Sequence, residues 1–189
     1  MDVHPKRFFR LNARLLKVAS CGSLPDIFLV PRQIRNSNLE DYSAAHISRL
    51  ADVEVLIESK TKRTTAAAHL GGVAVECRLK ELVIGYHQLT AWDQASKRPK
   101  DTWNGRPIPR PGHSLIGAVK LMSKLHEKAR TDPLFLTHLN RVIHPTGATE
   151  ADYIELRYSA YELGDDSLMD WRKSFDYVLG WLKKNEAML

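Results

Sequence analysis

The segment from Ala66 to Tyr86 constrains the fold more than any other part of the chain. Its sequence, AAAHLGGVAVECRLKELVIGY, contains no proline and only four charged residues. Apolar positions recur at intervals of three and four residues, which is helical periodicity with a wide apolar surface. The pattern predicts a central helix that packs on several sides, and 189 residues are enough to build a core around it. The stripe comprises Leu70, Val73, Cys77, Lys80 and Ile84.

Two of the charged residues on this helix are spaced to interact. Glu76 lies four residues before Lys80, so their side chains can pair along one face. Lys80 also continues the apolar stripe, which places a charge at the edge of the core. One interpretation is a structural ion pair whose lysine stem snorkels to water. The alternative is a polar cluster exposed at an interface with a partner.

The rest of the pattern predicts an all-α fold, an antiparallel bundle of four to five helices. Residues 39–59 should form a helix capped by Ser37 or Asn38, with Glu40 and Asp41 in its first turn. Residues 151–161 are ambiguous between helix and extended chain. Further helices are expected over residues 114–130, 132–143 and 167–187. Residues 1–38 are interpreted as an N-terminal arm, residues 39–189 as the helical domain, and residues 88–111 as one long Pro-rich loop.

Composition limits the classes of protein to consider. Hydrophobic residues make up 43% of the chain and charged residues 26%, the balance of ordinary globular proteins. No apolar run approaches the length of a membrane span, and the N-terminus lacks a clean cleavage site. Cys21 and Cys77 lie far apart and form no CxxC pattern. We therefore expect a cytoplasmic protein without a membrane segment, disulfide, bound metal or cofactor.

Positive charge is concentrated in two segments, residues 1–40, with seven Lys and Arg against three acids, and the loop. The net charge is +6, which favours an acidic partner such as nucleic acid. The loop sequence KRPKDTWNGRPIPR, residues 97–110, carries five basic residues, one acid and a tryptophan. Long loops in compact domains are often functional, although a solvated surface insertion is the plainer interpretation. The candidate RNA-binding residues are Lys97, Arg98, Lys100, Trp103, Arg106 and Arg110.

Three motifs resemble those of HEPN domains (higher eukaryote and prokaryote nucleotide-binding). LGGVAVECRLKELV, Leu70 to Val83, is similar to the signature helix of that family. GHSL, Gly112 to Leu115, resembles the start of its third helix, and DYIELRYSAY, Asp152 to Tyr161, resembles the segment before its final helix. The motifs occur in the family's order. The arm and the 88–111 insertion lie outside the resemblance.

The resemblance implies a homodimer with polar residues in a cleft at the dimer interface. Many HEPN proteins are metal-independent RNases of toxin–antitoxin and antiphage defence systems, with an Arg-x(4–6)-His motif in a late helix. Others accompany a minimal nucleotidyltransferase, or bind RNA or nucleotide without cutting it. Here Arg63 with His69 and Arg106 with His113 have the motif's spacing, but neither pair lies in a late helix. Arg141 and His144 lie late but are too closely spaced.

By alignment with the family's motifs, the candidate catalytic residues are His113 and Arg157, with Tyr158 beside the latter. A histidine can move the 2′-OH proton of RNA, and an arginine can stabilise a pentavalent phosphate. The structural alternative is that His113 caps a helix and Arg157 pairs with an acidic neighbour. No phosphate-binding glycine loop, HExxH motif or nucleophile elbow is present.

Together these patterns predict a HEPN-like protein that binds RNA or nucleotide in a defence or toxin–antitoxin system. A metal-independent endoribonuclease activity is one form of this hypothesis. The alternative is a non-catalytic partner module of a nucleotidyltransferase, or a helical adaptor. We also expect a homodimer, because the apolar surface of the central helix, together with Trp171 and Trp181, exceeds what a small bundle readily buries.

Overall fold

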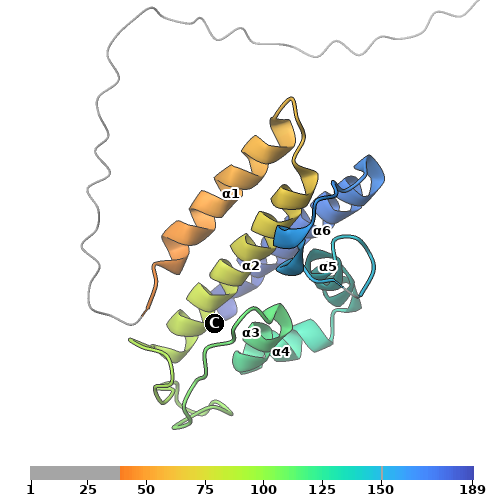
Figure 1. Ribbon diagram of the computed structural model, residues 1–189. Helices are drawn as coiled ribbons and strands as arrows, with labels where there is room; N and C mark the ends of the chain where they lie inside the picture. Colours follow the sequence, from red (N-terminus) through yellow and green to blue (C-terminus); the bar gives the residue numbers. More distant parts are fainter. Residues whose placement is uncertain (1–38, 150) are drawn as a thin grey trace, which may run out of the picture. The chain divides into compact units, whose positions relative to one another are not determined.

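The computed structural model describes residues 39–149 and 151–189 (Figure 1). Within these ranges the chain is all-helical, which confirms the predicted all-α class. The α-helices are α1 (Tyr42–Glu58), α2 (Thr64–His87), α3 (Leu115–Leu121), α4 (Ser123–Arg130), α5 (Pro133–Ile143) and α6 (Asp165–Asn185). Two short 3₁₀ helices, η1 (Glu155–Tyr158) and η2 (Glu186–Met188), complete the described elements. The predicted arm, residues 1–38, lies outside the described residues.

Helix α2 lies at the centre of the domain, as its wide apolar surface predicts. It packs against α1, α3, α5, α6 and η1, and Figure 1 shows α1 running alongside it in the opposite direction. The helix is buried on several sides because its flanking positions are apolar as well as its main stripe. None of the helices in the described ranges is long and apolar enough to cross a membrane.

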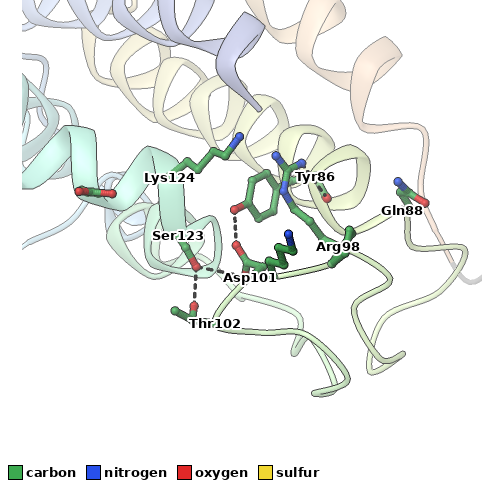
Figure 2. Close-up of a pocket in the computed structure, with 10 residues that line it drawn as sticks. Tyr86, Gln88, Arg98, Asp101, Thr102, Ser123 and Lys124 are labelled. Carbon is green, nitrogen blue, oxygen red and sulfur yellow. Dashed lines mark hydrogen bonds between the residues drawn. The ribbon is translucent and has the colours of Figure 1, made fainter.

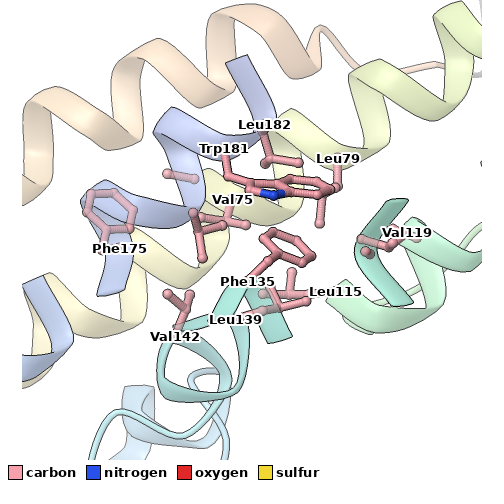
Figure 3. Close-up of a cluster of buried hydrophobic side chains, with 14 of the residues drawn as sticks. Val75, Leu79, Leu115, Val119, Phe135, Leu139, Val142, Phe175, Trp181 and Leu182 are labelled. Atoms are coloured by element: carbon pink, nitrogen blue, oxygen red, sulfur yellow. The ribbon is translucent and has the colours of Figure 1, made fainter. Parts of the chain in front are cut away.

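The core fills the space between α2, α5 and α6 (Figure 3). The Trp181 and Phe135 rings stack there with centroids 3.7 Å apart, and Leu79 and Leu139 belong to the same cluster. Trp171 is completely buried and Trp181 is 7% exposed. Both tryptophans are therefore covered within one chain. The homodimer stays a prediction, but unburied tryptophans cannot be the reason for it.

The glycine pair Gly71–Gly72 allows the closest packing in the domain. A β-carbon built on Gly71 would lie 2.4 Å from the Trp171 ring, and one on Gly72 would lie 2.2 Å from Tyr153. Such distances are shorter than any van der Waals contact, so only glycine leaves room for these two aromatic rings. The pair thus brings α2 directly against α6 and against the segment that precedes η1.

Helix α1 begins later than predicted, and its cap is a different residue. The cap of α1 is Asp41, whose carboxylate accepts a hydrogen bond of 3.0 Å from the Ala44 amide. Asp41 is thus the cap itself, while the predicted caps Ser37 and Asn38 lie outside the described residues. Glu40 lies before the helix, where it accepts a hydrogen bond from Tyr42 and pairs with Arg110 at 2.5 Å.

The helix predicted over residues 114–130 is two helices, α3 and α4, which are separated at Met122. Met122 has an extended backbone (φ −101°, ψ 95°) and a fully buried side chain. The Leu121 carbonyl, next to the break, accepts a 2.8 Å hydrogen bond from His87 Nε2. A tertiary contact therefore takes a carbonyl that a continuous helix would use for its own ladder.

The long loop over residues 88–111 follows a defined path. Paired backbone hydrogen bonds join its two halves, including Ser96 N to Arg106 O and Ile108 N to Gln94 O, both 2.9 Å. Ile108 is fully buried, and His87, at the end of α2, bonds to Ser96 Oγ at 2.7 Å. Because these hydrogen bonds and the buried Ile108 side chain fix the backbone of the loop, its exposed side chains project from defined positions.

Candidate functional site

A buried ion pair lies on the side of α2. Lys80 Nζ is 2.5 Å from Glu76 Oε1, and the two residues are 3% and 7% exposed. The lysine does not snorkel to water as expected from its position in the stripe. Its ammonium group stays in the interior, where it also lies 5.5 Å from the centre of the Tyr42 ring. An ion pair so well shielded from water depends on its remaining hydrogen bonds.

Glu76 is the centre of that hydrogen-bond cluster. Its second oxygen, Oε2, accepts from His113 Nδ1 at 2.9 Å and from the Tyr153 hydroxyl at 2.7 Å. Burial alone would raise the pKa of the Glu76 carboxyl, but the hydrogen bonds from Lys80, His113 and Tyr153 outweigh it and hold the pKa below its ordinary value. The carboxylate is therefore ionised at neutral pH.

Tyr153 joins the cluster from the segment before η1. Its ring lies on Gly72, and its hydroxyl also lies 2.7 Å from the His113 carbonyl oxygen. Burial raises the pKa of this hydroxyl, and the neighbouring Glu76 charge raises it further. Tyr153 thus stays protonated and serves as a hydrogen-bond donor that links α2 to the start of α3.

His113 is the accessible member of the cluster. Because a carboxylate can only accept, the Glu76 bond assigns the ring proton to Nδ1, so Nε2 is the unprotonated nitrogen of the neutral ring. The side chain is 61% exposed, in contrast to the three buried side chains around it. His113 is not the cap of α3, since Ser114 caps it through the Gly117 amide. An oriented imidazole with a free Nε2 has the form of a general base.

The other two candidate catalytic residues lie on η1, four and five positions after Tyr153. Arg157 stacks on the ring of its neighbour Tyr158, with the guanidinium carbon 4.6 Å from the ring centre. Both side chains are exposed, and neither forms an ion pair or side-chain hydrogen bond with a described residue. The expected pairing of Arg157 with an acidic neighbour is therefore absent from the described part of the chain. Among the described residues, no hydrogen bond or ion pair joins either residue to His113.

A pocket of about 460 Å³ lies between the basic part of the loop, residues 97–110 (the basic loop), and the start of α4 (Figure 2). Asp101 organises its floor by accepting hydrogen bonds from Tyr86 and from Ser123 Oγ, the latter at 3.1 Å. Arg98 lies over the Tyr86 ring, with its guanidinium carbon 3.9 Å from the ring centre. Lys100 and Lys124 also line the pocket. Its wall therefore combines three cations with hydroxyl and carboxylate groups.

The structure separates the predicted RNA-binding residues into two groups. Lys97, Lys100 and Arg106 are exposed, and their side chains pair with no acid in the described ranges. One face of the Arg98 guanidinium contacts the Tyr86 ring, and Arg110 forms an ion pair with Glu40. Three cations of the loop thus remain available for an anionic partner.

Trp103 does not stand free on the loop. It is half-buried and packs against the hydrophobic core, and its backbone amide donates to Asp101 Oδ1 at 2.9 Å. A tryptophan in this position holds the loop to the domain. Its replacement would change the path of the loop as well as any stacking surface, so it is a poor single test of RNA binding.

Tyr153 and His87 are the residues that sequence reasoning missed. Tyr153 lies within the DYIELRYSAY motif, but its partners Glu76 and His113 are 77 and 40 residues away. His87 is the last residue of α2 and is completely buried. Burial lowers the pKa of its imidazole, so the ring is neutral when it bonds to Ser96 and Leu121.

Within residues 39–149 and 151–189, no group of three or more histidine, cysteine or acidic side chains is arranged to hold a metal ion. Comparisons with protein-family models, with curated proteins and with solved structures found no match for the chain. The resemblance to HEPN domains accordingly stays a prediction from the three motifs. The basic loop and the hydrogen bond between Glu76 and His113 are the two features of the described residues that bear on function.

Proposed function

We propose that the protein binds single-stranded RNA through the basic loop. The main support for this proposal is that the loop presents three unpaired, exposed cations, Lys97, Lys100 and Arg106. The backbone that holds them is fixed by hydrogen bonds within the loop. A fixed array of this kind loses little conformational entropy when it meets a phosphate backbone. Arg98 adds a planar group beside the pocket, and bases of single strands stack on such guanidinium planes.

Salt dependence tests the RNA-binding proposal. The triple variant Lys97→Gln, Lys100→Gln, Arg106→Gln should bind a labelled single-stranded RNA more weakly. For every phosphate that is no longer neutralised, the slope of log affinity against log salt should also flatten by about 0.7, or by about 2 for three phosphates. Fluorescence anisotropy over a series of salt concentrations measures both quantities.

A control variant with the same change in net charge separates a site from a general charge effect. Lys60, Lys183 and Lys184 are exposed and lie outside the loop. Their joint replacement by glutamine should leave the salt slope near that of wild type. Equal slopes for both triple variants would contradict binding at the loop, and binding that does not respond to salt would reject it altogether.

Endoribonuclease activity is a second candidate function, favoured by the Glu76–His113 hydrogen bond. In this mechanism His113 Nε2 takes the proton of a 2′-OH, whose oxygen attacks the adjacent phosphorus. The bond from phosphorus to the 5′-oxygen breaks, the leaving oxygen takes a proton from water, and a 2′,3′-cyclic phosphate forms. Glu76 stabilises the imidazolium that results. Arg157 is the proposed group that stabilises the negative phosphate, with Tyr158 holding its guanidinium.

Incubation of labelled RNA in EDTA tests the cleavage step, since the proposed mechanism needs no metal. His113→Ala should reduce the rate by about 10²-fold or more, the usual contribution of a positioned general base. Arg157→Ala should also be slower. His126→Ala is a suitable control, because that imidazole makes no side-chain hydrogen bond within the described residues.

Two results would decide against the proposed cleavage mechanism. Cleavage that survives in His113→Ala at the wild-type rate would exclude this residue as the base. Binding of RNA without any cleavage by wild type would favour the alternative, a non-catalytic partner module of a nucleotidyltransferase or a helical adaptor. A small nucleotidyltransferase encoded beside the protein would favour the same alternative.

A further inference from the structure

A second polar pocket, of about 340 Å³, lies between α5 and the first half of α6. It takes no part in the sites described above. Its size is at the lower end of the range for small-ligand sites. The residues that matter here are His138, Arg141 and His144 from α5 and its C-terminus, and Asp170, Lys173 and Ser174 from α6.

Arg141 is the most constrained of these residues. Its Nη2 donates to Asp170 Oδ2 at 3.2 Å, a long ion pair with a carboxylate that is itself largely exposed. Its Nε atom is buried and has no hydrogen-bond acceptor among the described residues. An unpaired buried donor of this kind is costly. The Arg141 side chain as a whole is 24% exposed, so an anion in the pocket can reach the outer part of the guanidinium and accept a strong, charge-assisted hydrogen bond from it.

His138 is fixed in one tautomer by its neighbours. Ser174 Oγ donates its single proton to the Asp170 carbonyl at 2.9 Å, so it must accept from His138 Nδ1 at 3.0 Å. Nε2 of the neutral ring then carries a free lone pair. Burial lowers the pKa of His138, and the charge of Lys173 lowers it further, which keeps the ring neutral at pH 7.

His144 is oriented in the same way. Its Nδ1 lies 3.1 Å from the Ala151 carbonyl, which can only accept, so Nδ1 carries a proton, and in the neutral tautomer Nε2 is the acceptor. The pocket wall thus contains two cations, Arg141 and Lys173, together with two imidazoles whose Nε2 atoms accept hydrogen bonds. Among the residues that the structure describes, Asp170 is the one carboxylate in the wall.

We propose that this pocket binds a phosphate group, as a nucleoside monophosphate or as the terminal phosphate of a polynucleotide. Arg141 and Lys173 would neutralise the phosphate oxygens, while His138 and His144 would accept hydrogen bonds from adjacent sugar hydroxyls or from a protonated phosphate oxygen. The C-terminal dipole of α5 opposes an anion close to His144. The phosphate is therefore placed at the Arg141 and Lys173 side, and the hydroxyl-bearing part of the ligand at the His144 side.

Titration of the full chain with inorganic phosphate tests the site, with histidine ring signals in two-dimensional NMR as the readout. Chloride at matched ionic strength is the reference. We expect the His138 and His144 signals to shift saturably with phosphate alone. Lys173→Gln should weaken binding about tenfold, the factor that corresponds to the loss of one hydrogen bond to a charged group. Lys184→Gln, an exposed lysine later on α6, should bind as wild type does.

Two further ligands distinguish the sources of the phosphate. Tighter binding of adenosine monophosphate than of inorganic phosphate supports a free nucleotide. Tighter binding still of a 5′-phosphorylated dinucleotide, but not of its 5′-hydroxyl form, supports the end of a polynucleotide. Shifts that chloride reproduces, or equal phosphate affinity in wild type and Lys173→Gln, would overturn the proposal. Arg141→Gln is a second probe of the site. Lys173→Gln is the cleaner one, because Lys173 is exposed and its replacement leaves the hydrophobic core unchanged.

The phosphate pocket does not depend on the proposed function of the loop. The loop variant at Lys97, Lys100 and Arg106 keeps every residue of the pocket, and Lys173→Gln keeps every residue of the loop. Loss of RNA binding and loss of phosphate binding are therefore separate results.

Discussion

Replacing Lys80 with methionine is expected to lower the free energy of unfolding by about 3 kcal/mol, because the buried Glu76 carboxylate is deprived of its counter-ion. His113 and Tyr153 would remain bonded to Glu76, but neither carries the fixed charge of the lysine. Urea denaturation of wild type and variant measures the difference. The effect should be large because both side chains of the pair are almost completely shielded from water.

Two companion variants test the explanation. Replacing Glu76 and Lys80 together with apolar residues should cost less than Lys80→Met alone, because no charge is left unpaired. The Tyr153 hydroxyl would still have the His113 carbonyl as an acceptor. At the exposed pair Arg172–Asp176, also four residues apart, Asp176→Asn should cost less than about 1 kcal/mol. Equal losses at the buried and exposed pairs would show that burial does not set the size of the effect.

Replacing Gly72 with alanine is expected to destabilise the fold by about 3 kcal/mol, at the upper end of the range for an overpacked core. The new methyl group would lie 2.2 Å from Tyr153 Cδ2 and 2.7 Å from its Cβ, so the ring and its backbone must both move. That movement should also pull the Tyr153 hydroxyl away from Glu76. Denaturant unfolding measures the first effect, and the His113 ring signal in NMR follows the second.

The same helix supplies the control. Gly85 is also in α2, but a β-carbon built there meets no atom within 4 Å. Gly85→Ala should therefore stabilise the protein by up to about 1 kcal/mol, the difference in helix propensity between the two residues. If Gly72→Ala unfolded at the same denaturant concentration as wild type, the Tyr153 ring would have room to shift.

The helices could largely be predicted from periodicity, because each of them covers a contiguous run with its own apolar face. The break at Met122 could not, since nothing around this residue in the sequence marks the end of a helix. The break accompanies the bond between the Leu121 carbonyl and His87, whose ring belongs to another helix 34 residues earlier. The Asp41 cap was missed because several residues near it are equally good caps by type.

The candidate site was predictable in its members more than in its geometry. Glu76 with Lys80 followed from helical spacing, and His113 from a motif. The hydrogen bond between Glu76 and His113 spans 37 residues, and no local pattern encodes such a contact. Tyr153 lies in the DYIELRYSAY motif, but nothing in that motif identifies Glu76 as its partner. The contact depends on Gly72, which leaves room for the Tyr153 ring on α2.

The contacts that hold the loop in place do not involve its exposed cationic side chains. Its path is set by backbone hydrogen bonds, by buried Ile108 and by His87. None of these depends on the side chains of Lys97, Lys100 or Arg106. Those three positions can therefore be exchanged, in evolution or in the laboratory, without refolding the loop. Under the proposed function, the RNA preference of the loop could therefore be changed one side chain at a time while the helices beneath stay the same.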